Sequence, residues 1–374
     1  MRKDMAKVIV LGSLPESLIN FRGPLLQTMV ATGHEVHAIA PTADQTVVAA
    51  LTKMGVHFHT VPLARTGLNP LRDLTTLLAL HNLFRSLRPD CVLAYTIKPV
   101  IYGCLAGRMV GSPCYAMITG LGYTFTAPRM KGWLVGKLAR ILYKLALSQA
   151  ERVFFQNVDN LRVFAEAGLL RNQNQAVLIN GSGVNLDHYA STTLPISPIF
   201  LMIARLLKDK GIVEYVDAAR LVKRQYPNAK FLLVGWADSN PAAVDKETLN
   251  AWISEGVIEY LGPLPDVRPA IEAASIYVLP SYHEGMPRTV LEAMSMGRPV
   301  ITTDVPGCRE TVVHERNGLL VPVRDTLALA NAMRFFIEHP EKTAEMGAAS
   351  RQLAVTKFDV RLVNHTILET MELL

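Results

Sequence analysis

The sequence predicts an α/β protein built from two doubly wound parallel sheets. Short apolar segments alternate with helical patterns along the chain, and these segments fall into two series separated by a polar, proline-bearing stretch. A length of 374 residues suggests two domains, and an apolar content of 50% is enough for two hydrophobic cores. We therefore expect two sheets, each covered by helices.

The first series supplies seven strand-like segments, most of them continuous apolar runs, as parallel strands buried on both faces are. They are Val8–Leu11, Glu35–Ala40, Phe58–Pro62, Cys91–Tyr95, Tyr115–Thr119, Arg152–Gln156 and Gln175–Ile179. The second series supplies five more. They are Phe200–Ile203, Lys230–Val234, Ile258–Leu261, Ile276–Leu279 and Pro299–Thr302.

The break between the two series lies near Asp187–Pro198, where residues 191–198 read Ser-Thr-Thr-Leu-Pro-Ile-Ser-Pro. We therefore predict an N-terminal domain of residues 1–186 and a C-terminal domain of residues 187–359, with residues 360–374 forming a last helix.

Positive charge is concentrated in the first half of a chain whose net charge is +6. Residues 1–185 carry 19 Lys and Arg against 9 Asp and Glu, which is a net charge of +10, whereas the rest of the chain has a net charge of −4. An excess of this kind indicates an anionic partner for that half. Nucleic acid, an anionic bilayer and phosphorylated substrates all satisfy this requirement.

Cysteine usage and the N-terminus indicate a cytoplasmic protein. The four cysteines have no CxxC spacing, so a disulfide framework is not expected in a chain of this size. The apolar run Ala6–Leu11 is too short for a signal peptide, and no segment reaches the ~20 apolar residues of a spanning helix.

Residues 281–310 are the most informative segment. They begin after the strand-like run Ile276–Leu279, pass through a turn with glycine and proline, and continue into a predicted helix at Thr289–Met296. The N-terminus of such a helix offers N–H groups and a positive dipole end to an anion. Glu284 and Glu292 beside it can accept hydrogen bonds from sugar hydroxyls. An anion site next to two such acceptors suits a nucleotide-sugar.

Arg205 and Lys210 follow the first strand of the second series, at the edge of the sheet where ligands bind in doubly wound folds. Their spacing lets a guanidinium and an ammonium group reach one diphosphate. Taken alone, each would more simply be a solvated loop cation.

Glu284 and Glu292, with seven residues between them, resemble the paired-glutamate motif of the retaining glycosyltransferases of the large GT4 family, which have the GT-B fold. Residues Leu201–Gly211 resemble the diphosphate-binding segment of that family. The chain is also similar to bacterial transferases that add N-acetylgalactosamine to undecaprenyl-diphosphate-linked sugars. The motifs that carry this similarity are Ile203-Ala-Arg205, Asp209-Lys-Gly211, Leu279-Pro-Ser-Tyr282, Glu284-Gly-Met-Pro287 and Leu291-Glu-Ala293.

The resemblance implies two Rossmann-like domains that face each other across a cleft, with the last helix crossing back to the first domain. It also implies a UDP-sugar site in which Glu292 accepts from the ribose and Glu284 faces the hexose. Backbone N–H groups would hold the sugar and diphosphate, and they would come from Gly285, Met286, Arg288, Thr289 and Val290. The alternative for Glu292 is a helix-dipole role, worth ~0.3–1 kcal/mol.

Three further residues are weaker candidates for the nucleotide site. Gly235 ends a predicted strand, where a base or ribose could approach the backbone closely. By resemblance, Leu264 and Asp266 would frame the uracil edge. Ordinary turn roles explain all three equally well.

The expected chemistry is glycosyl transfer with a nucleoside diphosphate as leaving group, with Glu284, Arg205 and Lys210 as the catalytic residues. Charge grows on the β-phosphate as the bond to the sugar breaks, so fixed cations and N–H groups are the main requirement. No cofactor is expected, and because the sequence has no Asp-x-Asp pair, metal independence is predicted. Retention of configuration is implied by the resemblance alone.

The N-terminal domain is expected to bind the acceptor. Many members of the family place a histidine where this chain has Thr119, after the fifth strand. Asn20 and Arg22 are expected to reach the cleft, where Arg22 could meet an acceptor phosphate or simply cap surface structure. Lys98 follows the fourth strand and is a further candidate.

Residues 128–146 interleave basic and apolar side chains in the pattern of a helix at a membrane interface. The alternative is a helix packed on the sheet with a solvated basic face. The residues predicted to contact the membrane are Arg129, Lys131, Trp133, Lys137, Arg140 and Lys144.

These observations together predict a cytoplasmic glycosyltransferase at the inner face of the cell membrane. Its partners would be a UDP-sugar, most simply UDP-N-acetylgalactosamine, a polyprenyl-diphosphate-linked acceptor and anionic lipid, with no nucleic acid. Two rivals remain: an epimerase of the same fold, which needs no acceptor, and a non-catalytic sugar-nucleotide binder.

Overall fold

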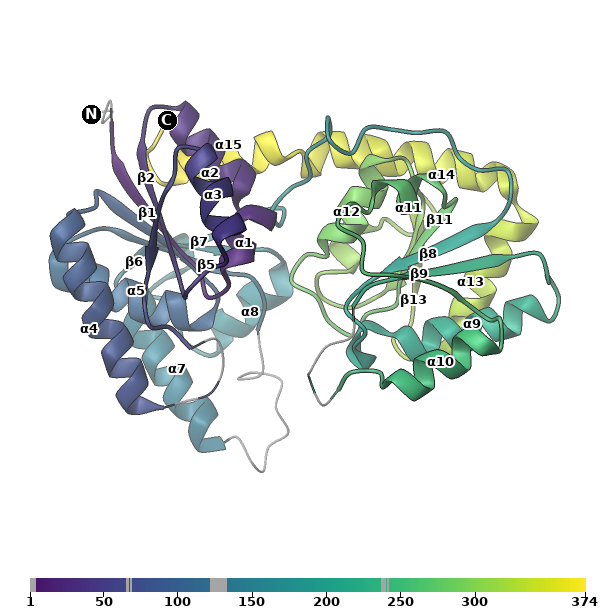
Figure 1. Cartoon of the computed structure of the whole chain (residues 1–374), viewed down its shortest axis with the longest axis horizontal. Coiled ribbons are helices and arrows are strands. Elements are labelled where there is room, and N and C mark those ends of the chain that lie inside the picture. Colours follow the sequence, from purple (N-terminus) through teal and green to yellow (C-terminus); the bar gives the residue numbers. More distant parts are fainter. Residues whose placement is uncertain (1–4, 65–66, 68, 122–132, 237–239, 241) are drawn as a thin grey trace. The chain divides into compact units, whose positions relative to one another are not determined.

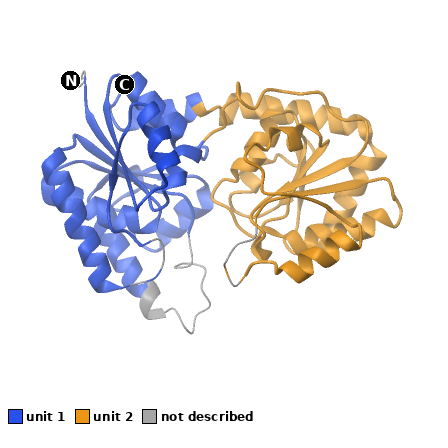
Figure 2. Ribbon diagram, viewed as in Figure 1, with its two compact units in different colours: residues 1–182, 361–374 blue, residues 183–360 orange. Residues whose placement is uncertain are grey.

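The computed structural model describes the chain except residues 1–4, 65–66, 68, 122–132, 237–239 and 241. The chain forms two compact units, shown in different colours in Figure 2. Unit 1 comprises residues 1–182 and 361–374, and unit 2 comprises residues 183–360.

Unit 1 contains a parallel sheet of seven strands in the order β3-β2-β1-β4-β5-β6-β7. Strand β1 pairs with β2 and β4, so that Val8 lies opposite Val36 on one side and Cys91 on the other. The strands are β1 (Lys7–Leu11), β2 (Glu35–Ala40), β3 (His57–Thr60), β4 (Cys91–Tyr95), β5 (Cys114–Ile118), β6 (Ala150–Phe155) and β7 (Ala176–Leu178).

Helices cover both faces of this sheet, and each face has its own hydrophobic core (Figure 1). One core involves α1 (Pro15–Asn20), α2 (Gly23–Ala31) and α3 (Gln45–Lys53). The other involves α4 (Pro70–Leu87), α5 (Ile97–Val110), α7 (Trp133–Leu147) and α8 (Val158–Glu166).

The end of the chain belongs to unit 1. Helix α15 (Val360–Thr370) places Val363, Ile367 and Leu368 in the same core as α1 to α3. Its Asn364 side chain donates a hydrogen bond to the Thr28 hydroxyl at 3.0 Å.

Unit 2 contains a parallel sheet of six strands in the order β10-β9-β8-β11-β12-β13. The strands are β8 (Ile199–Ile203), β9 (Lys230–Val234), β10 (Glu259–Gly262), β11 (Ile276–Leu279), β12 (Val300–Thr303) and β13 (Gly318–Val321). The helices are α9 (Ile212–Lys223), α10 (Lys246–Ser254), α11 (Arg268–Glu272), α12 (Arg288–Ser295), α13 (Thr326–Glu338) and α14 (Pro340–Leu353).

Every strand expected from the sequence is present, with ends shifted by two residues at most, and β13 is an addition. Strand β13 was not predicted because it is a four-residue edge strand that begins at a glycine. The expected strand Phe58–Pro62 ends earlier, at Thr60, because Pro62 has no N–H group with which to continue the ladder.

The boundary between the units differs from the expected position after residue 186. Val184 accepts a hydrogen bond from the N–H of Val360 at 3.0 Å, and its own N–H donates to Phe358 at 2.8 Å. Residues 183–186 therefore belong to unit 2. The expected linker at 187–198 also lies in unit 2, where one buried arginine donates hydrogen bonds to its backbone.

That arginine is Arg298, whose side chain is fully buried. Its guanidinium donates to the carbonyl groups of Thr192 and Thr193 at 3.0 and 3.1 Å. It also donates to the carbonyl groups of Ile271 and Glu272, both at 3.0 Å. Burial lowers the pKa of Arg298 to about 10, so this group remains charged at neutral pH.

Replacing this guanidinium should destabilise unit 2. Arg298→Met keeps an apolar stem but leaves several buried carbonyl groups without a donor, so we expect a loss of about 3 kcal/mol in the free energy of unfolding. Urea denaturation followed by circular dichroism measures it. Arg224→Met, at an exposed position, is the control. Equal stability of the two variants would contradict the role given to Arg298.

Candidate functional site

The candidate site lies at the carboxyl edge of the six-stranded sheet, where the strand order reverses. Strands β8 and β11 are neighbours, but the chain continues from β8 to β9 on one side and from β11 to β12 on the other. In open α/β sheets, ligands bind at such a switch point. The loops that follow β8 and β11 carry Lys210 and Glu284.

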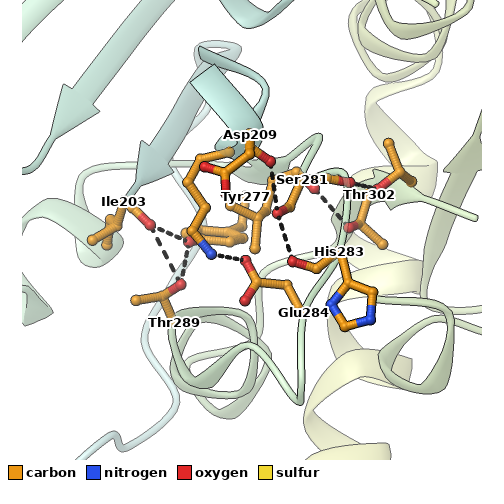
Figure 3. A network of polar contacts seen from close by, with 11 residues as sticks. Ile203, Asp209, Tyr277, Ser281, His283, Glu284, Thr289 and Thr302 are labelled. Carbon is orange, nitrogen blue, oxygen red and sulfur yellow. Dashed lines mark hydrogen bonds and ion pairs between the residues drawn. The ribbon is translucent and has the colours of Figure 1, made fainter. Parts of the chain in front are cut away.

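These two loops are bonded to each other through their backbones. The Tyr282 N–H donates to the Asp209 carbonyl at 2.8 Å, and the Ser281 hydroxyl donates to the same oxygen at 3.2 Å (Figure 3). A Cβ atom at Gly211 would lie 2.1 Å from the Pro280 carbonyl oxygen, so only glycine allows the loops to approach this closely.

The approach of the loops brings Lys210 and Glu284 into a short ion pair. The Lys210 ammonium lies 2.6 Å from Glu284 Oε1, and both side chains are largely buried (Figure 3). This charge-assisted bond fixes the Glu284 side chain at the carboxyl edge of the sheet. The two residues were predicted to act in one site, and the structure brings them together.

A third loop holds the backbone of Glu284. Its N–H donates to the Pro306 carbonyl at 3.1 Å. A Cβ atom at Gly307 would lie 2.3 Å from the Glu284 carbonyl oxygen. Gly307 was not singled out by the sequence analysis, although the Val305-Pro-Gly307 run after a strand was a visible turn signal.

Helix α12 begins beside this pair. Pro287 is its N-cap residue and supplies no side-chain hydrogen bond to the first turn. Thr289 is fixed against the end of β8, since its hydroxyl accepts from Tyr277 at 2.6 Å and contacts the Ile203 carbonyl at 3.4 Å (Figure 3).

Glu292 is buried in the same helix, with 4% of its surface exposed. Its carboxylate lies 2.7 Å from the Arg288 guanidinium and accepts a hydrogen bond from the Tyr189 hydroxyl. Burial raises the pKa of Glu292, while Arg288 and Tyr189 act in the opposite direction. In its ionised form, a carboxylate fixed at this depth can accept hydrogen bonds from a diol.

Tyr189 is a site residue that the sequence analysis missed. It is buried, and its carbonyl accepts a hydrogen bond from the Ser295 hydroxyl at 2.6 Å, which fastens the residue to α12. No local motif marked Tyr189, because its partners Arg288 and Glu292 are distant in the sequence.

Some of the other expected nucleotide-site residues are engaged in local structure. The Val290 N–H, expected to hold the diphosphate, donates instead to the Pro287 carbonyl at 3.2 Å. The Asp266 carboxylate binds the Arg268 side chain at 2.7 Å and its N–H at 3.0 Å. These bonds lower the pKa of Asp266 to about 2. Asp266 thus stabilises the start of α11.

The remaining nucleotide-site candidates lie around the same edge of the sheet. Arg205 follows β8 and is half-buried. Gly235 follows β9, where a Cβ atom would lie 1.8 Å from the Ala204 carbonyl oxygen, so glycine is required there by protein packing alone. Met286 and Leu264 pack partly against the core of unit 2, and Gly285 lies in the turn between Glu284 and α12.

In unit 1, the four expected acceptor residues follow the carboxyl ends of strands β1, β4 and β5. Thr119 directly follows β5, and Asn20 is the exposed last residue of α1. Arg22 is buried, not a surface cap: its guanidinium lies 5.0 Å from the centre of the Tyr95 ring and donates to the Ser182 hydroxyl at 3.3 Å.

Lys98 is not available as an acceptor ligand in this structure. It is buried in α5, where its ammonium forms a 2.6 Å ion pair with Asp73 of α4. Lys98 lies in the first turn of α5, after β4 as expected, but its charge is paired inside the protein. A partner on a helix outside the motif cannot be read from the sequence.

The basic segment forms helix α7, although Arg129 and Lys131 lie outside the described residues and the side chain of Trp133 is not described. Lys137, Arg140 and Lys144 are exposed. The apolar side chains that face the sheet are Ala139, Tyr143, Ala146 and Leu147.

None of the described helices is long and apolar enough to cross a membrane. No group of three or more His, Cys, Asp or Glu side chains among the residues that the structure describes could hold a metal ion.

Comparison with known proteins identifies the class. A family described as "Glycosyl transferases group 1" matches residues 197–339, and one described as "Glycosyl transferase 4-like domain" matches residues 23–181. The crystal structure of HepE from Anabaena in complex with UDP superposes with a TM-score of 0.79, covering 98% of this chain and 100% of that chain at 20% identity.

Two curated relatives are similar over most of the chain. An N,N'-diacetylbacillosaminyl-diphospho-undecaprenol alpha-1,3-N-acetylgalactosaminyltransferase from Campylobacter jejuni is 28% identical, covering 93% of each chain. A UDP-Gal:alpha-D-GlcNAc-diphosphoundecaprenol alpha-1,3-galactosyltransferase from Escherichia coli is 25% identical, covering 73% of each. The chain belongs to the GT4-like glycosyltransferases, and its two Rossmann-like units are those of the GT-B fold.

The contact between Tyr189 and Glu292 gives a prediction for nucleotide binding. Tyr189→Phe removes a bond that favours the ionised carboxylate, so the pKa of Glu292 should rise further above its usual value. We expect UDP to bind roughly three- to tenfold more weakly at neutral pH. Affinity should also begin to fall at a higher pH on acidification than in the wild type.

Calorimetric titration with UDP between pH 5 and pH 8 measures both effects. Tyr226→Phe is the matched control, because the Tyr226 hydroxyl also donates to a carboxylate, that of Glu338, on the exposed surface. An unchanged pH profile in Tyr189→Phe would show that the hydroxyl does not tune Glu292.

Proposed function

We propose that this glycosyltransferase moves a hexosamine, most simply N-acetylgalactosamine, from a UDP-sugar to a polyprenyl-diphosphate-linked saccharide, with retention of configuration. The observation that carries this proposal is the Lys210–Glu284 ion pair at the switch point, with Glu292 buried in the adjacent helix α12.

The site chemistry supports a nucleoside diphosphate donor. Lys210 and Arg205 would neutralise the charge that grows on the diphosphate as the sugar leaves, and the N-terminus of α12 would add its dipole. Glu284 would accept hydrogen bonds from the hexose, and Glu292 from the ribose. Solved relatives hold UDP, UDP with glucose, or UDP-glucose, which is consistent with this assignment.

Binding of the donor has to change the Lys210–Glu284 pair. An ammonium group 2.6 Å from a carboxylate is already largely neutralised, so it stabilises a phosphate less than a freed ammonium would. We propose that the incoming diphosphate draws Lys210 toward itself, which releases Glu284 to the sugar hydroxyls. Neither group needs a metal ion in this scheme.

The acceptor assignment rests on the two curated relatives, whose names both specify a diphosphoundecaprenol-linked sugar. Positive charge in residues 1–185 is suited to such an anionic acceptor. With α7 exposing Lys137, Arg140 and Lys144, we place the protein at the inner face of the cell membrane as a peripheral protein.

A panel assay tests the donor and the acceptor together. We expect UDP release from one UDP-N-acetylhexosamine that depends on a polyprenyl-diphosphate-linked saccharide and is unaffected by EDTA. Conversion of the donor without acceptor would instead indicate an epimerase. Loss of turnover in EDTA, restored by Mg²⁺ or Mn²⁺, would contradict metal independence.

Removing the charge of Glu284 should affect catalysis far more than folding. Glu284→Gln keeps the shape of the side chain but breaks the ion pair with Lys210, and we expect turnover to fall by about 100-fold or more. Steady-state UDP release measures this fall, and a thermal melt measures stability. Glu255→Gln is the control, since Glu255 forms an ion pair with Arg220 on the surface of unit 2. Wild-type turnover in Glu284→Gln would remove Glu284 from the site.

A further inference from the structure

One face of the unit 1 sheet is covered by helices α4, α5, α7 and α8. Helix α5 lies between α4 and α7 and contacts both (Figure 1). Nearly all of α5 is buried, from Lys98 to Gly107. In this part of the layer, the surface is therefore provided by α4 and α7.

Both helices expose an apolar stripe with the same spacing. On α4 the stripe consists of Leu71, Leu74 and Leu78, and on α7 it consists of Leu138, Ile141 and Leu145. Leu71 is 78% exposed and the other five are between 44% and 53% exposed. Residues separated by three and then four positions share one helix face, so each stripe is continuous.

The exposed apolar stripe of α4 is not the side that folds against the protein. The buried side of this helix is formed by Asp73, Thr76, Leu80 and Phe84, which lie on the opposite face. Leucines on the outer face gain nothing from the core of unit 1 and expose apolar surface to water. They require another apolar environment to be stabilising.

The outer face of α4 is also free of negative charge. Asp73 is the single acidic residue between Pro70 and Leu87, and it is buried in the ion pair with Lys98. The exposed charges on α4 are therefore the cations Arg72 and Arg85. Helix α7 likewise has no acidic residue from Trp133 to Leu147.

We propose that α4 is a second membrane-docking helix, which together with α7 seats unit 1 on the surface of an anionic lipid bilayer. The leucine stripe would enter the boundary between headgroups and acyl chains, and the arginines would lie among the lipid phosphates. This inference rests on the proposed function, in which the acceptor is a lipid-linked saccharide in a membrane.

Charge identifies a bilayer as the occupant of this face and argues against a second copy of the chain. Two copies would bring basic faces together without acidic partners, and like charges at a desolvated contact repel. An anionic bilayer satisfies the apolar and the basic groups at once. Two helices also give two points of attachment, which fixes the orientation of unit 1 on the membrane as one helix does not.

The test is flotation of the full-length protein with vesicles of phosphatidylcholine alone, or of equal parts phosphatidylcholine and phosphatidylglycerol. We expect the wild type to bind the anionic vesicles. The variant L71S/L74S/L78S should bind them about tenfold more weakly. A control variant, I253S/L327S/L362S, removes three exposed apolar side chains from other helices and should bind as the wild type does.

A second variant separates charge from apolar insertion. Arg72→Gln with Arg85→Gln should weaken binding to the anionic vesicles, and the remaining binding should depend less on salt than that of the wild type. Binding of the leucine variant equal to that of the control would overturn the proposal. A wild-type dimer that the leucine variant dissociates would also overturn it, because the face would then join two copies.

Two readouts separate this inference from the proposed activity. An unchanged circular dichroism spectrum and thermal melt of the leucine variant would show that unit 1 remains folded, so that the loss of binding concerns the surface of α4. Unchanged UDP affinity would show that the donor site is unaffected. If the wild type floats through α4 but turns over no lipid-linked acceptor, the docking surface is supported and the proposed acceptor is contradicted.

Discussion

The close contact of three loops at the switch point of unit 2 is the constraint on which the candidate site depends. Gly211 packs against the Pro280 carbonyl and Gly307 against the Glu284 carbonyl, at distances that leave no room for a side chain. Because the backbones are in contact, the side chains of Lys210 and Glu284 start close together and can form an ion pair. Most of the conformational entropy of these side chains is therefore lost on folding, and little more is lost when a ligand binds.

Much of this organisation could be predicted from the sequence, because it depends on local patterns. Apolar runs marked the strands, and the position of Lys210 and Glu284 directly after two of them placed both at one edge of a sheet. Tyr189 and Lys98 could not be assigned in this way. A tyrosine acquires its role from a carboxylate distant in the chain, and the buried partner of Lys98 is visible only once α4 and α5 have packed.

The two glutamates of the motif show how environment separates residues of one type. Glu284 is paired with Lys210 at the edge of the sheet, so an anionic ligand that attracts Lys210 can break this ion pair. Glu292 is held below the surface by Arg288 and Tyr189, so its geometry is fixed before binding. Such a division suits a donor whose sugar must react while its ribose only has to be held.

The placement of acidic side chains in unit 1 accounts for how its charge is presented. Asp73 is paired within the protein, and Asp90 accepts the N–H of Lys7 at 2.7 Å. Glu35 is bound by His37 and Lys7, and the bond from His37 is the main cause that lowers the pKa of Glu35. These three carboxylates are bonded to groups of unit 1 itself, inside the unit or close to its sheet. Helices α4 and α7 expose cations, and the one acidic residue in their sequences, Asp73, is buried. An anionic surface therefore meets a more positive field at these two helices than the net charge of +6 suggests.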